Sequence, residues 1–119
     1  MLVRYKKSCE KIAMGLLSLM PQQKNVKALR KTIVLYGENP SWQLYLLKVE
    51  EDYVGLIGIE VEEQFFTVHH ISVLPSFRGE GLGHVIVEKI QKQMQGREMQ
   101  GTTETRAFLN KCKQELAAI

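Results

Sequence analysis

Hydrophobic and polar residues alternate along some segments of the chain and recur every three or four residues along others. Alternation is typical of strands and the longer spacing of helices, so the pattern predicts nine elements. They run strand, helix, helix, three strands, helix, strand and helix, over residues 2–5, 8–20, 25–36, 42–49, 53–61, 65–74, about 82–95, 97–103 and 105–118. We expect one α/β (α+β) domain over residues 1–119, with helices flanking a mixed, mostly antiparallel sheet.

Turn and capping residues separate these elements. Ser8 and Asn25 are the expected N-caps of the first two helices, and Pro21 ends the first of them. The acidic turn Glu50–Asp52 is expected to join two strands as a hairpin. The residues expected to face the core from the four helices are Ile12, Ala13, Leu16, Leu17, Leu19 and Met20; Val26, Leu29, Ile33 and Tyr36; Leu82, Val85, Ile86, Ile90 and Met94; and Phe108, Leu109, Cys112 and Leu116.

Composition limits the kinds of partner that the protein is expected to bind. The 119 residues carry a net charge of +3, and the basic residues are scattered, which argues against a nucleic-acid partner. A mildly positive protein still suits an anionic ligand. Cys9 and Cys112 lack metal-ligand spacing, so we expect no metal site, and we expect reduced thiols in a cytoplasmic protein. The apolar run at residues 12–20 is too short to span a bilayer, so we expect no membrane partner.

The most informative segment is Ile71–His84, in which a strand ends, three alternating glycines follow and a helix begins. The N–H groups and dipole of a helix N-terminus attract anions, and glycines let a phosphate approach the backbone. The segment lacks the Lys-Ser or Lys-Thr of a P-loop and the G-x-G-x-x-G spacing of dinucleotide-binding folds. From these residues alone, a phosphate site and a glycine-rich turn without a ligand both remain open.

The pattern Val73-x-Pro75-x-x-Arg78-Gly79-x-Gly81-Leu82-Gly83 resembles motif A of the GNAT acetyltransferase superfamily, V-x-P-x-x-R-[GN]-x-G-[IL]-[GA], at every position. The order of elements also resembles the GNAT fold. The resemblance implies an acetyl-CoA-dependent N-acetyltransferase, in which a small amine or a protein lysine attacks the thioester directly and neither cysteine is a nucleophile. The residues it implies for the cofactor are Ile71, Ser72, Val73, Arg78, Gly79, Glu80, Gly81, Leu82, Gly83 and His84.

The resemblance also implies which part of the cofactor each group of residues would contact. In GNAT proteins the fourth and fifth strands splay apart, and the main chain of residues 71–73 would line the pantetheine arm in that gap. Backbone N–H groups of residues 78–84 would hold the pyrophosphate. A finer likeness, to the RibT-like proteins of bacterial riboflavin operons, is carried by Met1–Met20 and His70–Val73.

His69 and His70 are the candidate general bases, because an ordinary imidazole titrates near neutral pH. Side chains alternate along a strand, so only one of the two is expected to face the acetyl group. The GNAT resemblance favours His69 and, more weakly, Thr67, because the family's acid or base lies an even number of residues before Val73. His70 would then face the other side, and either histidine could instead be a hydrogen-bonded structural residue.

The sequence departs from the GNAT pattern near its C-terminus. Aligned with the family segment A-x-x-F-Y-x-K, residues 105–111 place Leu109 where GNAT enzymes often carry a tyrosine that protonates the leaving thiolate. Thr102 replaces the usual asparagine, and the chain ends without the two further strands of typical members. These departures leave open a catalytically weak CoA-binding domain, regulatory or partner-binding, and an unfinished sheet edge suggests a homodimer.

Overall fold

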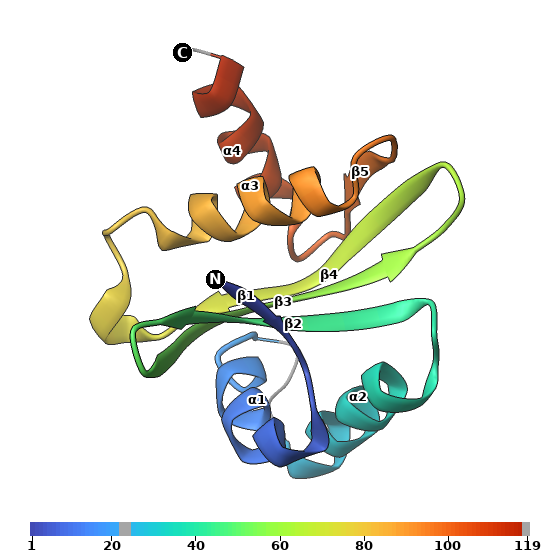
Figure 1. Ribbon diagram of the computed structural model, residues 1–119, viewed down its shortest axis with the longest axis vertical. Helices are drawn as coiled ribbons and strands as arrows, with labels where there is room; N and C mark the ends of the chain where they lie inside the picture. The colour runs from blue at the N-terminus through green and yellow to red at the C-terminus, as the bar shows by residue number, and fades with distance from the viewer. Residues whose placement is uncertain (22–24, 118–119) are drawn as a thin grey trace.

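A five-stranded sheet runs through the middle of the molecule (Figure 1), as described by a computed structural model covering residues 1–21 and 25–117, with side chains through Cys112. The strands are β1 (Leu2–Arg4), β2 (Trp42–Val49), β3 (Asp52–Val61), β4 (Phe65–Val73) and β5 (Glu98–Gly101). They lie side by side in chain order, and every neighbouring pair is antiparallel except β4 and β5, which are parallel. The predicted mixed, mostly antiparallel sheet is confirmed.

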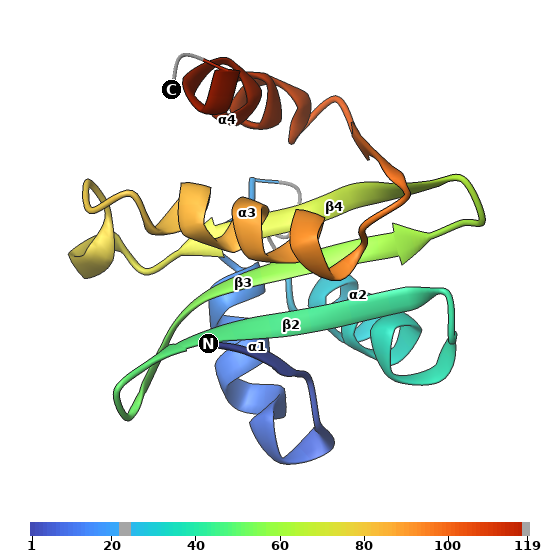
Figure 2. The ribbon, with the colours of Figure 1, turned by 45° about the horizontal axis from the view of Figure 1, so that its top comes forward.

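A pair of helices lies on each side of the sheet (Figures 1 and 2). The first pair is α1 (Glu10–Leu17) and α2 (Val26–Glu38), and the second is α3 (Leu82–Gln93) and α4 (Arg106–Ala117). Single 3-10 turns at Lys7–Cys9 and Pro75–Phe77 precede α1 and α3. The predicted order of nine elements is therefore confirmed. Within the described ranges, no helix combines the length and apolar character needed to cross a membrane.

Each face of the sheet carries its own hydrophobic core. The α1/α2 face buries Ala13, Leu16, Leu17, Leu29, Ile33, Tyr36, Leu44, Leu46 and Leu56. The α3/α4 face buries Tyr45, Leu47, Val54, Ile57, Ile59, Phe66, Val68, Ile86, Val87, Ile90, Met94, Met99, Leu109 and Cys112. Each fully buried aliphatic or phenylalanine side chain contributes about 1.5–3 kcal/mol, so these two layers fix the helices on the sheet.

Four local predictions are wrong. Pro21 does not end α1, because the helix ends at Leu17, four residues earlier. Ser8 does not cap α1, because it lies in the preceding 3-10 turn, and Cys9 occupies the cap position without a side-chain bond. Ile12 is 42% exposed and Val26 58% exposed. The sheet covers only the stripe of α1 that includes Ala13 and Leu16, and Ile12 lies one residue outside it. Val26 is the first residue of α2, before the helix reaches the sheet.

Two other local predictions are confirmed. The Asn25 side chain accepts a hydrogen bond from the Ala28 N–H at 2.8 Å, so the predicted N-cap of α2 is confirmed. The hairpin between β2 and β3 is also confirmed. Leu116, predicted to face the core, has a side chain outside the described set.

Two irregularities of β4 shape the region around its middle. Its pairing with β3 shifts by one residue, since Gly58 lies opposite His70 while Ile59 lies opposite Val68. Such a bulge sets two residues of one strand against one of its neighbour. In addition, β4 pairs with β5 only from Phe65 to Val68, so among the described residues no strand lies beside the rest of β4 on that side.

Replacing Gly58 by alanine is expected to destabilise the protein by about 1–3 kcal/mol, because overpacking forces side chains or backbone to shift. A Cβ atom at Gly58 would overlap the Tyr36 side chain, which packs against the sheet at this point. Urea unfolding followed by circular dichroism measures the change.

The matched control is Gly15→Ala in α1, where a Cβ would meet nothing within 4 Å. It should raise stability by about 0.5–1 kcal/mol, the usual cost of a helical glycine. Equal stability of the Gly58→Ala and wild-type proteins would show that Tyr36 can leave the sheet without cost.

Candidate functional site

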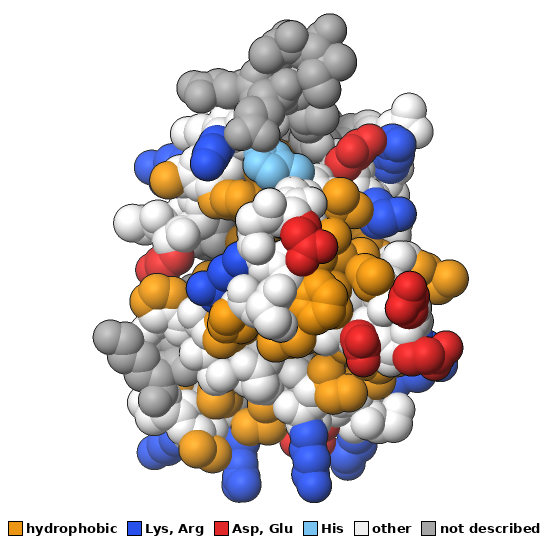
Figure 3. Space-filling model, turned by 90° about the vertical axis from the view of Figure 1, so that its left-hand side faces the viewer, with side chains coloured by type: hydrophobic (Ala, Val, Ile, Leu, Met, Phe, Trp, Pro, Cys, Tyr) orange, Lys and Arg blue, Asp and Glu red, His pale blue; other side chains and the backbone are white. Residues whose placement is uncertain are grey.

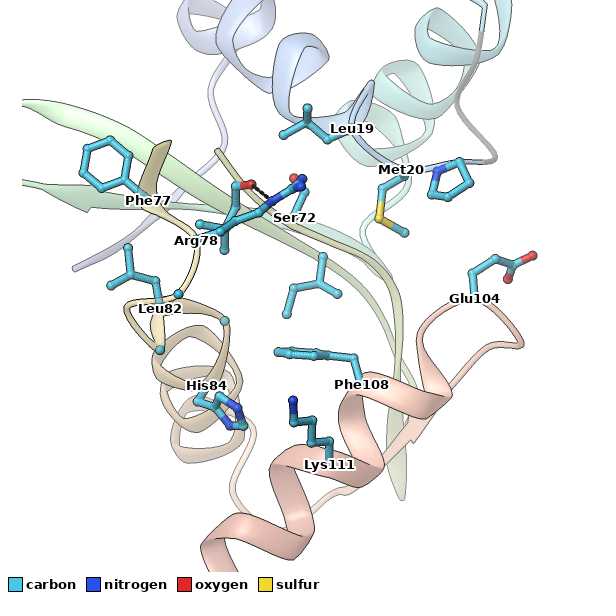
Figure 4. A pocket seen from close by; sticks show the side chains of 16 residues that line it. Leu19, Met20, Ser72, Phe77, Arg78, Leu82, His84, Glu104, Phe108 and Lys111 are labelled. Atoms are coloured by element: carbon cyan, nitrogen blue, oxygen red, sulfur yellow. Dashed lines mark hydrogen bonds between the residues drawn. The ribbon is translucent and has the colours of Figure 1, made fainter. Parts of the chain in front are cut away.

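A cavity of about 650 Å³ opens where β4 separates from β5. Four parts of the chain enclose it: the end of β4, the glycine-rich loop, the turn after α1, and the start of α4 with the loop before it (Figure 4). Its lining consists of Leu19, Met20, Pro21, Ile71, Ser72, Val73, Phe77, Arg78, Gly79, Gly81, Leu82, Gly83, His84, Glu104, Phe108 and Lys111.

The glycine-rich loop ends as the N-terminus of α3. Gly79 and Gly81 have φ angles of 87° and 75°, in the left-handed region that side chains with a Cβ disfavour. Gly81 is the N-cap of α3, no side chain caps the helix, and its first internal bond runs from the Val85 N–H to the Gly81 carbonyl at 3.1 Å. The helix dipole and the N–H groups of the first turn thus favour an anion here.

The edge of β4 forms another wall. At the point of divergence, the Val68 carbonyl accepts a bond from Thr105 Oγ1 at 2.8 Å, in place of a β5 amide. Beyond it, Ile71–Val73 continue along the cavity without a strand on that side. The Ser72 hydroxyl donates to the Leu16 carbonyl at 2.8 Å, on the α1 side. Main chain is therefore the part of Ser72 that can meet a ligand.

The cavity gathers most of the residues predicted for the cofactor, and others that sequence reasoning missed. Every predicted residue lines it except Glu80, which is exposed on the loop. The residues missed are Leu19, Met20, Pro21, Phe77, Glu104, Phe108 and Lys111. Phe108 and Lys111 belong to the C-terminal segment that resembles GNAT proteins, which was the available signal for them.

Charge is unevenly distributed around this end of the molecule. Arg78, His84 and Lys111 lie toward the loop side of the cavity, while Glu104 stands apart at the opposite end (Figure 4). The Arg78 side chain folds back, and its Nε donates to the Val73 carbonyl at 3.1 Å. Figure 3 shows a hydrophobic band through the middle of this face, with acidic side chains gathered at one edge. An elongated ligand with one anionic end fits this polarity.

His69 and His70 do not line the cavity and lie together on the α1/α2 face of the sheet. The expectation that they face opposite sides is wrong, because the β4 bulge interrupts the alternation between them. Their ring centroids are 6.4 Å apart, and both belong to a cluster with Tyr36 and Trp42.

His70 is buried against α2. Its Nδ1 is 2.6 Å from the Tyr36 hydroxyl. Burial, and next the neighbouring His69, lower the pKa of His70 to about 4, against the opposing effect of Glu104. Burial also raises the pKa of Tyr36, reinforced by the charge of Glu60. Both groups are therefore neutral near pH 7, and a single hydrogen bond joins the phenol to the imidazole.

His69 has a different environment. Its Nε2 lies 3.0 Å from Glu60 Oε1, and its ring stacks on Trp42 with centroids 4.3 Å apart and planes inclined by 29°. Its side chain is 24% exposed. Of the two histidines, His69 is the one that solvent can reach and that a carboxylate accompanies.

Leu109 is 3% exposed and belongs to the α3/α4 core. Its neighbour Phe108 reaches the cavity instead. Among the described side chains of α4, Phe108 and Lys111 line the cavity, and neither has a hydroxyl group.

The low pKa of His70 predicts a loss of stability in mild acid. The unfolded histidine titrates near 6.5 and the folded one near 4, so between these values only the unfolded chain binds the proton. This contribution is complete above about pH 6.5 and is lost as the pH falls to about 4; 1.36 kcal/mol per unit gives about 3 kcal/mol.

Urea unfolding at about pH 7.5 and about pH 4.5 measures the effect. A His70→Asn variant, which keeps an acceptor for Tyr36 but cannot titrate in this range, should lose correspondingly less stability between these pH values. The same loss in both proteins would mean that other groups cause it.

Known proteins resemble this chain in sequence and in fold. A family model described as an acetyltransferase (GNAT) domain matches residues 12–116. The "uncharacterized N-acetyltransferase in lysA 3'region" of Bacillus methanolicus is 45% identical over 114 residues, 95% of each chain.

Several solved structures resemble this chain in fold. The aminoglycoside acetyltransferase AAC(6')-Iy, in complex with a bisubstrate analogue, has a TM-score of 0.77 at 16% identity, over 98% of this chain and 88% of its own. A GNAT family acetyltransferase from Elizabethkingia anophelis with acetyl-CoA bound has a TM-score of 0.70 at 15% identity, over 98% and 73%. With the family match over most of its length, this chain belongs to the GNAT acetyltransferase family.

Proposed function

We propose that this protein is an acetyl-CoA-dependent N-acetyltransferase that modifies a small amine or a protein lysine. The observation that carries the proposal is the cavity, which joins the glycine-rich N-terminus of α3 to the unpaired edge of β4. One end suits a diphosphate and the other an extended chain. Membership of the GNAT family and the CoA or acetyl-CoA in related solved structures support the same cofactor.

The residues around the cavity fit this cofactor. A Cβ at Gly79 or Gly81 would meet nothing within 4 Å, so phosphate oxygens have room beside the backbone. The amides at the start of α3 would hold the pyrophosphate, with Arg78 and Lys111 nearby for further charge. The β4 main chain at Ile71–Val73 would bond to the pantetheine amides. The volume of about 650 Å³ lies within the usual range of ligand sites.

When bound, acetyl-CoA supplies an acetyl thioester that an amine can attack. The amine must first lose a proton, and we assign that proton to His69, which it would reach through water because His69 does not line the cavity. His69 is partly exposed and paired with Glu60, so its ring can be charged at low desolvation cost. His70 is neutral near pH 7 and bonded to Tyr36, which suits a structural role. Neither cysteine lines the cavity, in keeping with direct attack.

A second candidate function is a CoA-binding domain with weak catalysis, regulatory or partner-binding. The observation that favours it is the apolar Leu109, which alignment places where family enzymes often have a tyrosine. On this hypothesis the cofactor binds, but no side chain of α4 within the described set protonates the leaving thiolate.

Several finer assignments remain proposals. The likeness to RibT-like proteins rests on Met1–Met20 and His70–Val73, and would link the protein to riboflavin operons by genomic context. Cytoplasmic location and a homodimer are also predictions from the sequence. None of these changes which residues would hold the cofactor.

Binding of CoA is expected to stabilise the wild-type protein by about 2.7 kcal/mol when CoA is at 100 times its Kd. A Gly81→Glu variant should lose this stabilisation, because the carboxylate would occupy the anion site and repel phosphate. Thermal unfolding with and without CoA measures both effects.

The matched control is Gly96→Glu. Gly96 has a φ of 94° and open space around it, but lies beyond the other end of α3. Both substitutions carry the cost of a left-handed residue, about 1–2 kcal/mol, and only the first should affect CoA. Equal CoA stabilisation of both variants would contradict the assignment of the loop.

Replacing His69 by alanine should lower turnover about 10²–10⁴-fold, the usual contribution of a general base, with the KM for acetyl-CoA unchanged. Release of the CoA thiol with a panel of small amines and lysine peptides measures the rate. Thr67→Ala tests the weaker sequence candidate in the same assay. Slow turnover that His69→Ala leaves unaltered, with CoA binding intact, would favour the second function.

A further inference from the structure

Three neighbouring strands bring Trp42, Glu60 and His69 together on the α1/α2 face. Trp42 of β2 lies directly opposite Glu60 of β3 in the sheet register. On β4, Thr67 is the residue paired with Glu60, and His69, two residues further along the strand, lies on the same face. Without the extra residue in β4, His69 and His70 would point to opposite faces.

Two side chains contact the ring of His69, one at its edge and one on its face. Glu60 Oε1 lies 3.0 Å from Nε2, and the Trp42 ring stacks on the imidazole at 4.3 Å. Trp42 is itself held by the edge of Tyr36, with centroids 5.5 Å apart, and Tyr36 bonds to His70. The plane of the His69 ring is thus set by a chain of contacts that ends in the buried part of α2.

The contact with Glu60 also distinguishes the two ring nitrogens of His69. A carboxylate only accepts hydrogen bonds, so Nε2 carries the proton that it donates to Glu60. In the part of the chain that the structure describes, this is the one hydrogen bond of the His69 ring, and no buried side-chain nitrogen or oxygen lacks a partner. Nδ1 is therefore accessible to solvent, with its lone pair available.

We propose that Glu60 and Trp42 are positioning residues for His69, which fix the Nε2–H tautomer and the ring plane so that Nδ1 is the proton acceptor. The proposal rests on the proposed function, in which His69 is the base. Because His69 does not line the cavity, one proton passes through water from the acceptor's ammonium nitrogen to Nδ1, and the amine keeps the electron pair of the broken N–H bond. The resulting imidazolium lies against the Glu60 carboxylate and returns the proton to water.

The tautomer can be read without any cofactor, from the ¹⁵N shifts of the histidine rings in the protein alone. The spectra are recorded about two units above the ordinary imidazole pKa of about 6.5. In the wild type, His69 should show a protonated Nε2 and an unprotonated Nδ1. Glu60→Gln, which retains an acceptor oxygen, should keep this pattern, and Glu60→Met should give a mixture of tautomers. An unchanged pattern in Glu60→Met would overturn the proposal.

Steady-state kinetics provide a second test of the positioning role. Glu60→Met should lower kcat about 10–100-fold, less than removal of the base itself, with the KM for acetyl-CoA unchanged. Glu60→Gln should fall between it and the wild type, because the amide preserves the tautomer but not the charge. Trp42→Phe should retain more activity than Trp42→Ala, since it keeps a stacking ring. Glu63→Met, in the exposed turn after β3, is the control and should match the wild type.

Stabilisation by CoA separates this proposal from the proposed function. If the wild type binds no CoA, the proposed function fails, whatever the tautomer of His69. If CoA binds equally to wild type and variants, but Glu60→Met has the wild-type tautomer and the wild-type kcat, only the positioning role fails.

Discussion

The middle of β4 is the constraint on which the site depends. A strand that leaves its parallel neighbour must satisfy its backbone groups elsewhere, because buried polar groups without partners are costly. Thr105 bonds to the Val68 carbonyl at the point of departure, and beyond it the edge of β4 faces a cavity instead of β5. One residue later the bulge changes which face the side chains take. The cavity at the edge of β4 and the histidine cluster on the α1/α2 face therefore originate within three residues of chain.

Much of the fold could be predicted from local pattern, because both periodicities are strong here. The strand predicted at 42–49 has the observed bounds, since an apolar run is followed by an acidic turn that permits a hairpin. Both ends of α1 were mispredicted, because the spacing of apolar residues does not fix where a helix begins and ends. Ser8 is a good N-cap residue by type, yet the chain makes a 3-10 turn there first. Which apolar residue stays exposed, as Ile12 does, depends on where the sheet lies, and periodicity alone does not contain that information.

The site likewise has one part that could be predicted from the sequence and another that could not. The glycine-rich loop is local, so a motif of eleven residues was enough to indicate it, and the structure places those glycines at a helix N-terminus. Met20, Glu104 and Phe108 reach the same cavity from distant elements, and only tertiary packing brings them together. The sequence also contains no signal for the bulge in β4. Two adjacent histidines in a strand are expected to lie on opposite faces, and no glycine or proline in β4 marks the extra residue.

The contrast between the two histidines shows how position decides the chemistry of one residue type. A charge on His70 would be buried beside a neutral phenol, and burial is the largest cause of its low pKa. A charge on His69 would lie against the Glu60 carboxylate and partly in water. Because transfer of an ion from water costs far more than transfer of a neutral ring, proton uptake belongs at the exposed, carboxylate-paired position. The buried histidine then fixes Tyr36, and through it Trp42, on which the exposed one stacks.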